Sequence, residues 1–173
     1  MDKTSNKPIR KQSLRLEGYD YSLEGAYFVT VVTRKRANLF GDVVNETIQL
    51  SPLGELLEQC WYAIPHHFPS TILGSFMIMP NHVHGIIIIK DQAVGARHAS
   101  PLLGTIIGSF KSAVSRQAGN VLGINNIWQR YYYVHIIRDQ QDLEQITSYI
   151  LDNPRQWNED EENPNNSQIK YST

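Results

Sequence analysis

The spacing of hydrophobic residues along the chain predicts five strands and three helices. Strands are indicated where β-branched and aromatic residues gather or alternate with polar ones, in segments 26–33, 43–50, 72–79, 82–90 and 127–138. Helices are indicated where apolar residues recur at intervals of three and four, in segments 51–64, 102–119 and 139–153. Ser51 and Asp139 have the side chains of helix N-caps, and Pro154 ends the last helix.

These elements follow one another as strand, strand, helix, strand, strand, helix, strand, helix. Strands interspersed with helices predict an α+β fold, with helices on one face of a largely antiparallel sheet. The order contains the βαββαβ core of ferredoxin-like and RRM-like domains. Since 173 residues suit one domain, we expect a basic N-terminal arm (1–24), a single folded domain (25–157) and an acidic, flexible tail (158–173).

Charge is unevenly distributed, although the formal net charge is only −1. Residues 1–36 carry eight Lys and Arg against four acidic residues, and residues 152–173 carry five acidic against two basic. This pattern is compatible with a phosphate-binding surface, but also with an ordinary solvated face. A single cysteine, Cys60, excludes a disulfide framework and a cysteine-based zinc site. No segment approaches the roughly 18 apolar residues of a membrane helix, so we expect a cytoplasmic protein.

Two histidines stand at the start of the most apolar strand, in "MPNHVHGIIIIK". Residues two apart in a strand point to the same face, so His82 and His84 share one face. Buried strands seldom carry ionisable side chains without a partner. The pair is suited to hold a metal ion, to act as acid and base, or to clamp a phosphate. Two strand histidines bonded to backbone or water explain the same spacing.

The last predicted helix contributes two further candidates, Tyr149 and Asn153. They are four residues apart, hence on one helical face, at the flank of the apolar stripe. From that flank they can face a site on the sheet. A half-buried structural tyrosine and a simple helix stop at Asn153-Pro154 are the competing interpretations.

Basic residues accompany the aromatic strand 127–138 and the middle helix. Arginines interleaved with tyrosines can contact phosphates and stack unpaired bases, whereas buried tyrosines and solvated arginines would give the same pattern. The residues that we expect to contact nucleic acid are Arg10, Lys11 and Arg15 on the arm, Lys111 and Arg116 on the middle helix, and Arg130 and Arg138 beside the strand.

Five segments together resemble the single-tyrosine HUH transposases, and most closely their REP-associated tyrosine transposase branch. They are "RLEGYDYSLEGAYFVTVVT", "MPNHVHGIIII", "FKS", "IWQRYYYVHIIRD" and "YILDNP", and the likeness extends from Arg15 to Trp157. The resemblance implies the HUH endonuclease fold. It also implies that His82 and His84 are metal ligands, that Tyr149 is the nucleophile and that Asn153 supplies a third ligand.

The same resemblance implies an activity, a cofactor and a partner. Such enzymes cut single-stranded DNA near a hairpin, form a 5′-phosphotyrosine link and leave a free 3′-OH that can later rejoin the strand. Mg²⁺ or Mn²⁺ is the expected metal, REP-like palindromes are the expected DNA, and a monomer is favoured over a homodimer. Two other functions stay open: a hairpin-binding module without cutting activity, and a small histidine-motif phosphoesterase, which would want a further histidine beyond the pair.

Overall fold

The computed structural model describes residues 24–90, 103–160 and 162–165. Its strands are β1 (Gly25–Val32), β2 (Gly41–Val44), β3 (Thr47–Leu50), β4 (Thr71–Met79), β5 (His82–Ile89) and β6 (Tyr133–Ile137). Its helices are α1 (Pro52–Tyr62), α2 (Ile64–His67), α3 (Leu103–Leu122) and α4 (Gln140–Asp152), with 3-10 turns η1 (Arg34–Arg36) and η2 (Trp157–Glu159). None of the described helices is both long and apolar enough to cross a membrane.

The main sheet has four strands in the order β4-β5-β1-β6, and every neighbouring pair is antiparallel. Taken with α1 and α3, the strands β1, β4, β5 and β6 follow one another as βαββαβ, and this spatial order is that of a ferredoxin-like core. The predicted α+β fold class is therefore confirmed. Strands β2 and β3 form a separate hairpin between β1 and α1.

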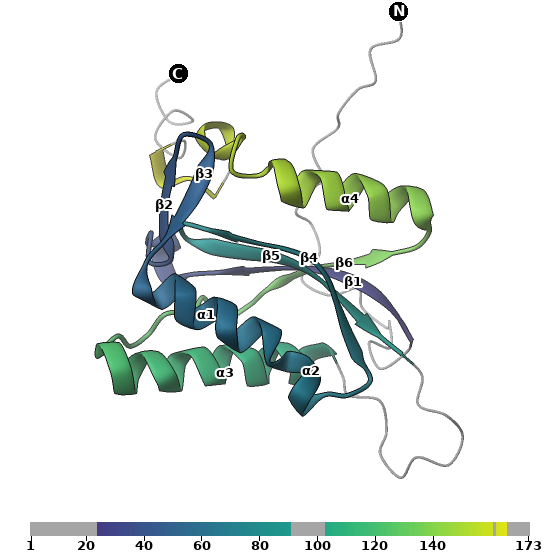
Figure 1. Ribbon diagram of the computed structural model, residues 1–173, viewed down its shortest axis with the longest axis horizontal. Helices are drawn as coiled ribbons and strands as arrows, with labels where there is room; N and C mark the ends of the chain where they lie inside the picture. Colours follow the sequence, from purple (N-terminus) through teal and green to yellow (C-terminus); the bar gives the residue numbers. More distant parts are fainter. Residues whose placement is uncertain (1–23, 91–102, 161, 166–173) are drawn as a thin grey trace, which may run out of the picture.

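Helices cover both faces of this sheet (Figure 1). One face packs against α1 and α3 through a large core that includes Val83 and Ile87 of β5. The other face packs against α4, where Ile86 and Phe28 meet Ile146 and Ile150. The expectation of helices on one face only is thus wrong for α4. The continuous run of isoleucines has a physical reason, because a strand buried on both faces needs apolar side chains on both.

Segment 43–50, predicted as one strand, is the β2–β3 hairpin. Asn45 and Glu46 form its turn with φ values of 50° and 61°, the left-handed backbone that a tight type I′ hairpin requires. The alternation of apolar and polar residues is interrupted at this turn by three consecutive polar residues, 45–47, so the sequence did carry a signal for it. The strand predicted at 127–138 is also shorter: β6 begins at Tyr133, and Trp128 pairs with Thr33 as an isolated bridge.

The segment after α4 packs against the domain, where its acidic composition predicts a flexible tail. Glu162 and Asn163 are 1% and 3% exposed. The Glu162 carboxylate lies 2.9 Å from the Nε of Arg36, and the side-chain amide of Asn163 donates to the backbone oxygen of Trp157 at 2.9 Å. An acidic segment is expected to be solvated only when its polar groups have no buried hydrogen-bond or ion-pair partners of this kind. Residues 1–23 of the predicted arm, and residues 161 and 166–173 of the predicted tail, lie outside the described residues.

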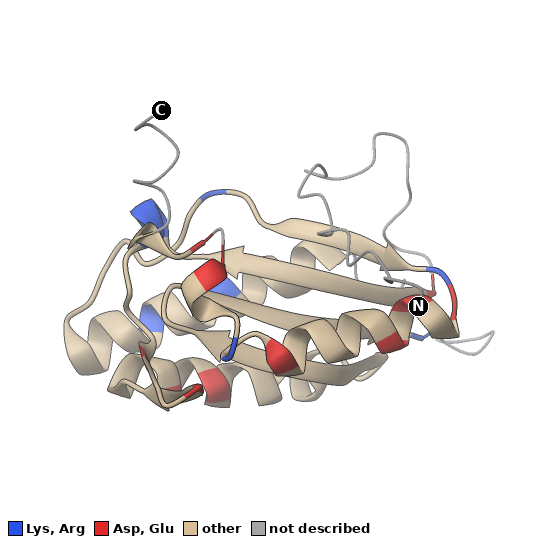
Figure 2. Ribbon diagram, turned by 90° about the horizontal axis from the view of Figure 1, so that it is seen from above, with Lys and Arg blue, Asp and Glu red and all other residues tan. Residues whose placement is uncertain are grey.

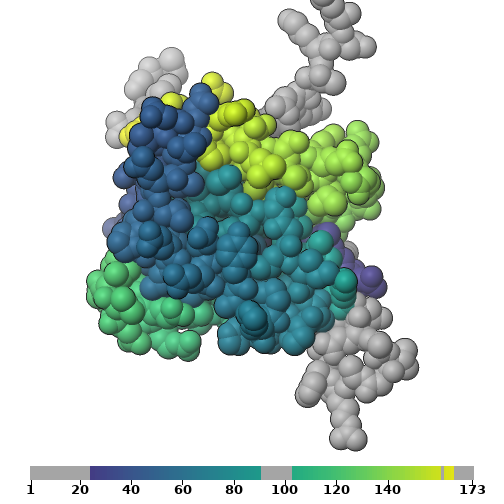
Figure 3. Space-filling view, viewed as in Figure 1, coloured from purple at the N-terminus to yellow at the C-terminus, as the bar shows by residue number. Residues whose placement is uncertain are grey.

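The β2–β3 hairpin lies beside this segment on the surface of the molecule (Figure 3). Their contact includes an exposed ion pair, in which Arg155 Nε is 3.6 Å from the Glu46 carboxylate. Exposed pairs of this kind add little to stability. The described part of this segment is therefore held mainly by the buried groups of Glu162 and Asn163.

Gly85 is the position in β5 that gives room to the indole of Trp61. A Cβ at position 85 would lie 2.3 Å from Trp61 Cζ2, and the ring is held between Phe76 and Phe110 with centroids at 4.5 and 5.4 Å. We expect Gly85→Ala to lower the free energy of unfolding by about 1–3 kcal/mol, as overpacking does. Urea denaturation measures this change.

Gly108, on the exposed side of α3, is the matched control. An added Cβ there meets no atom within 4 Å, and alanine is the better helix former by about 1 kcal/mol. Gly108→Ala should therefore leave stability unchanged or raise it. A Gly85→Ala variant that unfolds at the same urea concentration as the wild type would show that Trp61 is not confined.

Candidate active site

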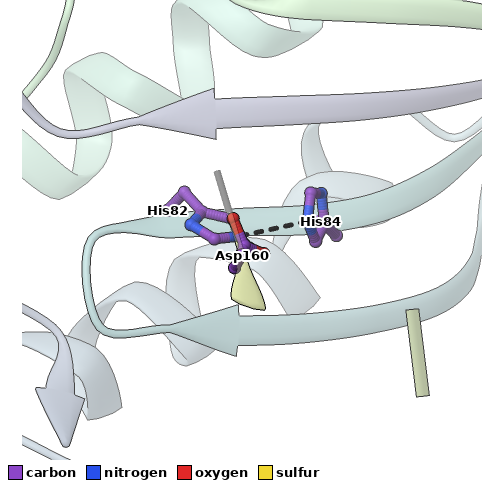
Figure 4. A group of neighbouring side chains, drawn as sticks. All are labelled: His82, His84 and Asp160. Atoms are coloured by element: carbon purple, nitrogen blue, oxygen red, sulfur yellow. Dashed lines mark hydrogen bonds and ion pairs between the residues drawn. The ribbon is translucent and has the colours of Figure 1, made fainter. Parts of the chain in front are cut away.

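His82 and His84 project from β5 on the face covered by α4, and the structure brings their rings together (Figure 4). Both are buried, at 0% and 1% exposure. Their Nε2 atoms are 3.0 Å apart and the ring centroids 4.5 Å apart. The two nitrogens therefore converge on one point, as the alternation of side chains along a strand predicts.

The remaining nitrogen of each ring is held by a neighbouring polar side chain. His84 Nδ1 lies 2.9 Å from the hydroxyl of Thr30, which faces it across the β1–β5 pair. His82 Nδ1 lies 2.9 Å from the side-chain oxygen of Asn81. Partners of this kind orient a metal-binding imidazole and select its tautomer. The arrangement leaves the Nε2 atoms facing each other.

Tyr149 of α4 lies over the histidine pair. Its hydroxyl is 3.5 Å from His84 Nε2, and its ring centroid is 5.3 Å from that of His84. The ring also meets Phe28 edge-on at 6.1 Å. Ile146 and Ile150, the buried residues of α4, dock the helix on the sheet and so set the height of Tyr149 above it. The predicted tyrosine and histidines are thus brought together.

Asn153 caps α4 one turn beyond Tyr149 and is 1% exposed. Its side-chain oxygen is buried and has no hydrogen-bond partner among the described residues. A buried polar atom without a partner costs about 1–3 kcal/mol, and among the described residues Trp61 Nε1, Ser70 Oγ and Thr71 Oγ1 share this property with Asn153. A bound cation would supply the missing partner, so this oxygen fits the ligand role implied for Asn153.

Asp160 is the acidic residue of the site that the sequence does not reveal. Its carboxylate oxygen lies 4.0 Å from His82 Nε2, and one ligand atom from each of His82, His84 and Asp160 lies within 4.8 Å of the others. Figure 4 shows the carboxylate beside the His82 ring. Asp160 stands in the acidic segment predicted to be flexible, and no local pattern distinguishes it from the acids around it.

The three side chains form a possible metal site. Two imidazole nitrogens and a carboxylate oxygen are donors that divalent cations accept. The carboxylate adds an anionic oxygen to the two neutral nitrogens, which strengthens the attraction for a cation. Since the groups are buried, this attraction is screened less than at the surface. The site therefore has the donors, the charge and the enclosure that a divalent cation needs.

Two of the predicted nucleic-acid contacts, Lys111 and Arg116, belong to α3 and thus lie on the face of the sheet opposite the histidines. Lys111 has a structural task, because its ammonium donates to the backbone oxygens of Gln129 and Arg130 at 2.6 and 3.2 Å. Burial lowers the pKa of Lys111. The structure does not bring these two residues to the histidine pair.

The other predicted contacts are exposed or lie outside the described residues. Arg130 sits 5.4 Å from the ring centroid of the exposed Tyr131, and Arg138 is exposed just after β6. Arg10, Lys11 and Arg15 lie outside the described residues, so their proposed role is a prediction from the sequence alone.

A basic turn, which contributes only to the charge of segment 1–36 in the sequence, lies at the histidine end of the sheet. It is η1, whose three residues Arg34, Lys35 and Arg36 follow β1 after the single residue Thr33. Since Val32 pairs with His82, the turn is at the same end of the sheet as the site; Figure 2 shows the distribution of the basic residues. Arg34 and Lys35 are exposed. The run of three basic residues was the signal available in the sequence.

Comparison with known proteins gives relatives in sequence and in structure. No family model matches the chain. A protein of Haemophilus influenzae described as uncharacterized is 39% identical over 165 residues, which are 87% of this chain and 92% of the relative. The chain belongs to one family with that protein. A second Haemophilus influenzae protein, named provisionally as a REP-associated tyrosine transposase, is 24% identical over 139 residues, which are 78% of this chain and 73% of the relative.

A solved REP-associated tyrosine transposase, bound to a REP hairpin, shares the fold. It aligns with a TM-score of 0.59 and 21% identity over 82% of this chain and 74% of that one. The resemblance found in the sequence motifs is confirmed by these relatives. Together they support a transposase-like, DNA-processing function for this chain.

Removal of the Asp160 charge is expected to weaken the binding of a divalent cation. Asp160→Asn keeps the shape of the side chain but loses the anionic oxygen, so we expect the Kd for Mn²⁺ to rise by about 10-fold, or about 1.4 kcal/mol. Isothermal titration calorimetry measures the constant. Asp142→Asn is the matched control, because Asp142 also pairs with a histidine, His135 at 2.9 Å, but on the partly exposed edge strand. Equal Kd values for Asp160→Asn and the wild type would exclude Asp160 as a ligand.

Proposed function

We propose that this chain, which resembles the REP-associated tyrosine transposases in sequence and shares their fold, cuts and rejoins single-stranded DNA beside a hairpin. One observation carries the proposal: the Tyr149 hydroxyl lies 3.5 Å from His84 Nε2, directly beside the convergent His82–His84 pair. A phenol next to a cation site is the arrangement that attack on a phosphodiester requires. A structural tyrosine would not need two buried histidines beneath it.

In the proposed reaction, Tyr149 attacks a backbone phosphorus of single-stranded DNA. The phenolic proton leaves for solvent, and a bond forms between the tyrosine oxygen and phosphorus. The bond from phosphorus to the 3′ bridging oxygen breaks, and that oxygen takes up a proton to become a free 3′-OH. The protein is then joined to the 5′ phosphate of the downstream strand.

The residues that would hold Mg²⁺ or Mn²⁺ are His82, His84, Asn153 and Asp160. When bound there, the cation would withdraw charge from a nonbridging phosphate oxygen and so lower the barrier to attack by an oxygen nucleophile. The chain supplies the remaining requirements. It buries the histidines and holds Tyr149 above them through Ile146 and Ile150.

The chemistry of the link suits rejoining as well as cutting. A phenolate is a better leaving group than an alkoxide, so a DNA 3′-OH can attack the phosphotyrosine and restore a phosphodiester without an external energy source. The related structure holds a REP hairpin, and we propose a hairpin of REP-like type as the DNA partner here. We further propose that the protein acts as a monomer on chromosomal DNA.

A covalent-capture experiment tests the nucleophile. Hairpin oligonucleotides from the DNA that flanks the gene are labelled at the 5′ or 3′ end, incubated with Mn²⁺, Mg²⁺ or EDTA, and run on a denaturing gel. We expect a cation-dependent protein–DNA adduct that retains only the 3′ label, because the 5′ fragment is released with its free hydroxyl.

Tyr149→Phe should abolish the adduct, since the phenol oxygen forms the bond, while Tyr62→Phe should leave it intact. Tyr62 is 58% exposed on α1, on the opposite side of the sheet, and so controls for the loss of a hydroxyl in general. Hairpin binding with no adduct under any cation would favour a DNA-binding module without cutting activity.

The basic turn η1 is the surface that we expect to contact DNA phosphates next to the site. Replacement of both Arg34 and Lys35 by Gln should weaken hairpin binding, and should reduce the slope of log K against log salt by about 0.7 to 0.9 for each lost contact. Fluorescence anisotropy at several salt concentrations measures both. Arg36 is left in place because it pairs with the buried Glu162.

Arg116→Gln is the control, since that residue is exposed on α3, on the far face. It should leave both the affinity and the slope unchanged. A larger loss with Arg116→Gln than with the Arg34 and Lys35 double variant would place the DNA on the α3 face, as the sequence-based expectation for Arg116 implies.

A further inference from the structure

Asn81, the residue immediately before β5, is fully buried and makes three hydrogen bonds. Its side-chain nitrogen donates to the backbone oxygens of Arg36 at 3.1 Å and Glu162 at 2.7 Å. Carbonyl oxygens only accept hydrogen bonds, so these two partners determine which way round the carboxamide lies. The amide oxygen of Asn81 must therefore face His82 Nδ1, 2.9 Å away.

This orientation determines where the proton of neutral His82 lies. An amide oxygen has no hydrogen to give, so His82 Nδ1 must be the donor and carries the N–H. The other nitrogen, Nε2, then carries the lone pair. His82 is thus already in the tautomer that a cation at Nε2 requires.

His84 is under a different constraint. Its Nε2 lies 3.0 Å from His82 Nε2, and two lone pairs do not meet at that distance without a proton or a cation between them. In the cation-free protein the proton between the rings must belong to His84 Nε2. In neutral His84, Nδ1 then carries a lone pair, and the Thr30 hydroxyl, 2.9 Å away, donates to it.

A cation between the rings needs lone pairs on both Nε2 atoms. His82 needs no change, but the proton of His84 has to move from Nε2 to Nδ1. The Thr30 hydroxyl can follow, because a hydroxyl both donates and accepts. It turns from donor to acceptor, and the total number of protons on the two rings stays the same.

We propose that Asn81 is a positioning residue that holds His82 permanently in its cation-binding tautomer, whereas His84 and the Thr30 hydroxyl reverse their hydrogen bond when a cation binds. The first half rests only on the hydrogen bonds of Asn81. The second half rests on the proposed cation site. Asn81 also ties His82 to Glu162, two residues from Asp160, so one side chain sets the position of both ligand-bearing segments.

Nitrogen-15 spectra of the histidine rings test the proposal. Long-range ¹H–¹⁵N correlations show which ring nitrogen is protonated, and they are recorded at about pH 8, above the usual histidine pKa of about 6.5. His82→Gln and His84→Gln assign the signals. Without cation we expect N–H at Nδ1 of His82 and at Nε2 of His84. With Zn²⁺, a diamagnetic probe that imidazole binds well, His84 should change to Nδ1–H and His82 should not change.

Matched variants separate positioning from folding. Asn81→Leu removes the oxygen acceptor together with both donated bonds and should release His82 into a mixture of tautomers. Thr30→Val removes the hydroxyl and should weaken Zn²⁺ binding by about 10-fold, while Thr30→Ser retains it. If Asn81→Leu does not fold, the wild-type spectra and the comparison of Thr30→Val with Thr30→Ser still test the proposed tautomers of His82 and His84.

A wild-type His82 with its proton on Nε2 would overturn the role of Asn81. A His84 that keeps its Nε2–H when Zn²⁺ is bound would overturn the tautomer change. The third outcome is that the cation-free spectra are as expected but do not change when any cation is added. The role of Asn81 would then stand, and the proposed function would lose its cation. If the DNA-adduct assay fails, the conclusions from the spectra about Asn81 and about the tautomer change of His84 are not affected.

Discussion

The antiparallel pairing of β1 with β5 is the constraint on which the rest of the molecule depends. These two strands form the centre of the sheet, with Thr30 opposite His84 and Val32 opposite His82. Side chains alternate between faces along a strand, so a slip of one residue would move both histidines to the α1 and α3 face. Gly85 favours this register, because the Trp61 indole lies against it and a Cβ at position 85 would be 2.3 Å from Trp61 Cζ2. Packing on one face therefore fixes the chemistry of the other.

The polar cluster under α4 is buried at a cost that its own hydrogen bonds offset. Thr30 and Asn81 each form a hydrogen bond with the Nδ1 atom of one histidine ring, and the Nε2 atoms of the two rings lie within hydrogen-bond distance of each other. Such a network is stable when nearly every member has a partner. Asn153 is the exception, with a buried oxygen that has no partner among the described residues. A cation in the proposed site would supply this missing partner.

Asp160 changes the character of the proposed cation site. Two histidines and an amide oxygen make a neutral donor set, which is weak for Mg²⁺ because imidazole favours zinc, nickel or copper. A carboxylate adds charge and the oxygen donor that harder cations prefer. The basic turn η1 at the same end of the sheet balances this acidity. The site thus combines a negative interior that suits a cation with an exposed positive edge that suits a phosphate chain.

The sequence by itself determined most of the elements, the fold class and the local partners of the site. The spacing of apolar residues predicted the βαββαβ order, and the two-residue period of a strand placed His82 and His84 on one face. The four-residue period of a helix did the same for Tyr149 and Asn153, because these relations depend only on the geometry of one element. Motifs resembling a known family then connected the two pairs.

Only the tertiary structure decided the relations between elements. In the structure α4 lies on the face opposite α1 and α3, and Lys111 and Arg116 lie far from the histidine pair on the α3 face. The Asp160 carboxylate lies 4.0 Å from His82 Nε2. The Asn45–Glu46 turn was missed for a local reason, since only three polar residues, 45–47, separate the apolar positions of two short strands. Asp160 was hidden for a global one. Its position depends on Trp157 and Glu162 packing against residues that are distant in the sequence, and no periodicity within one segment records such contacts.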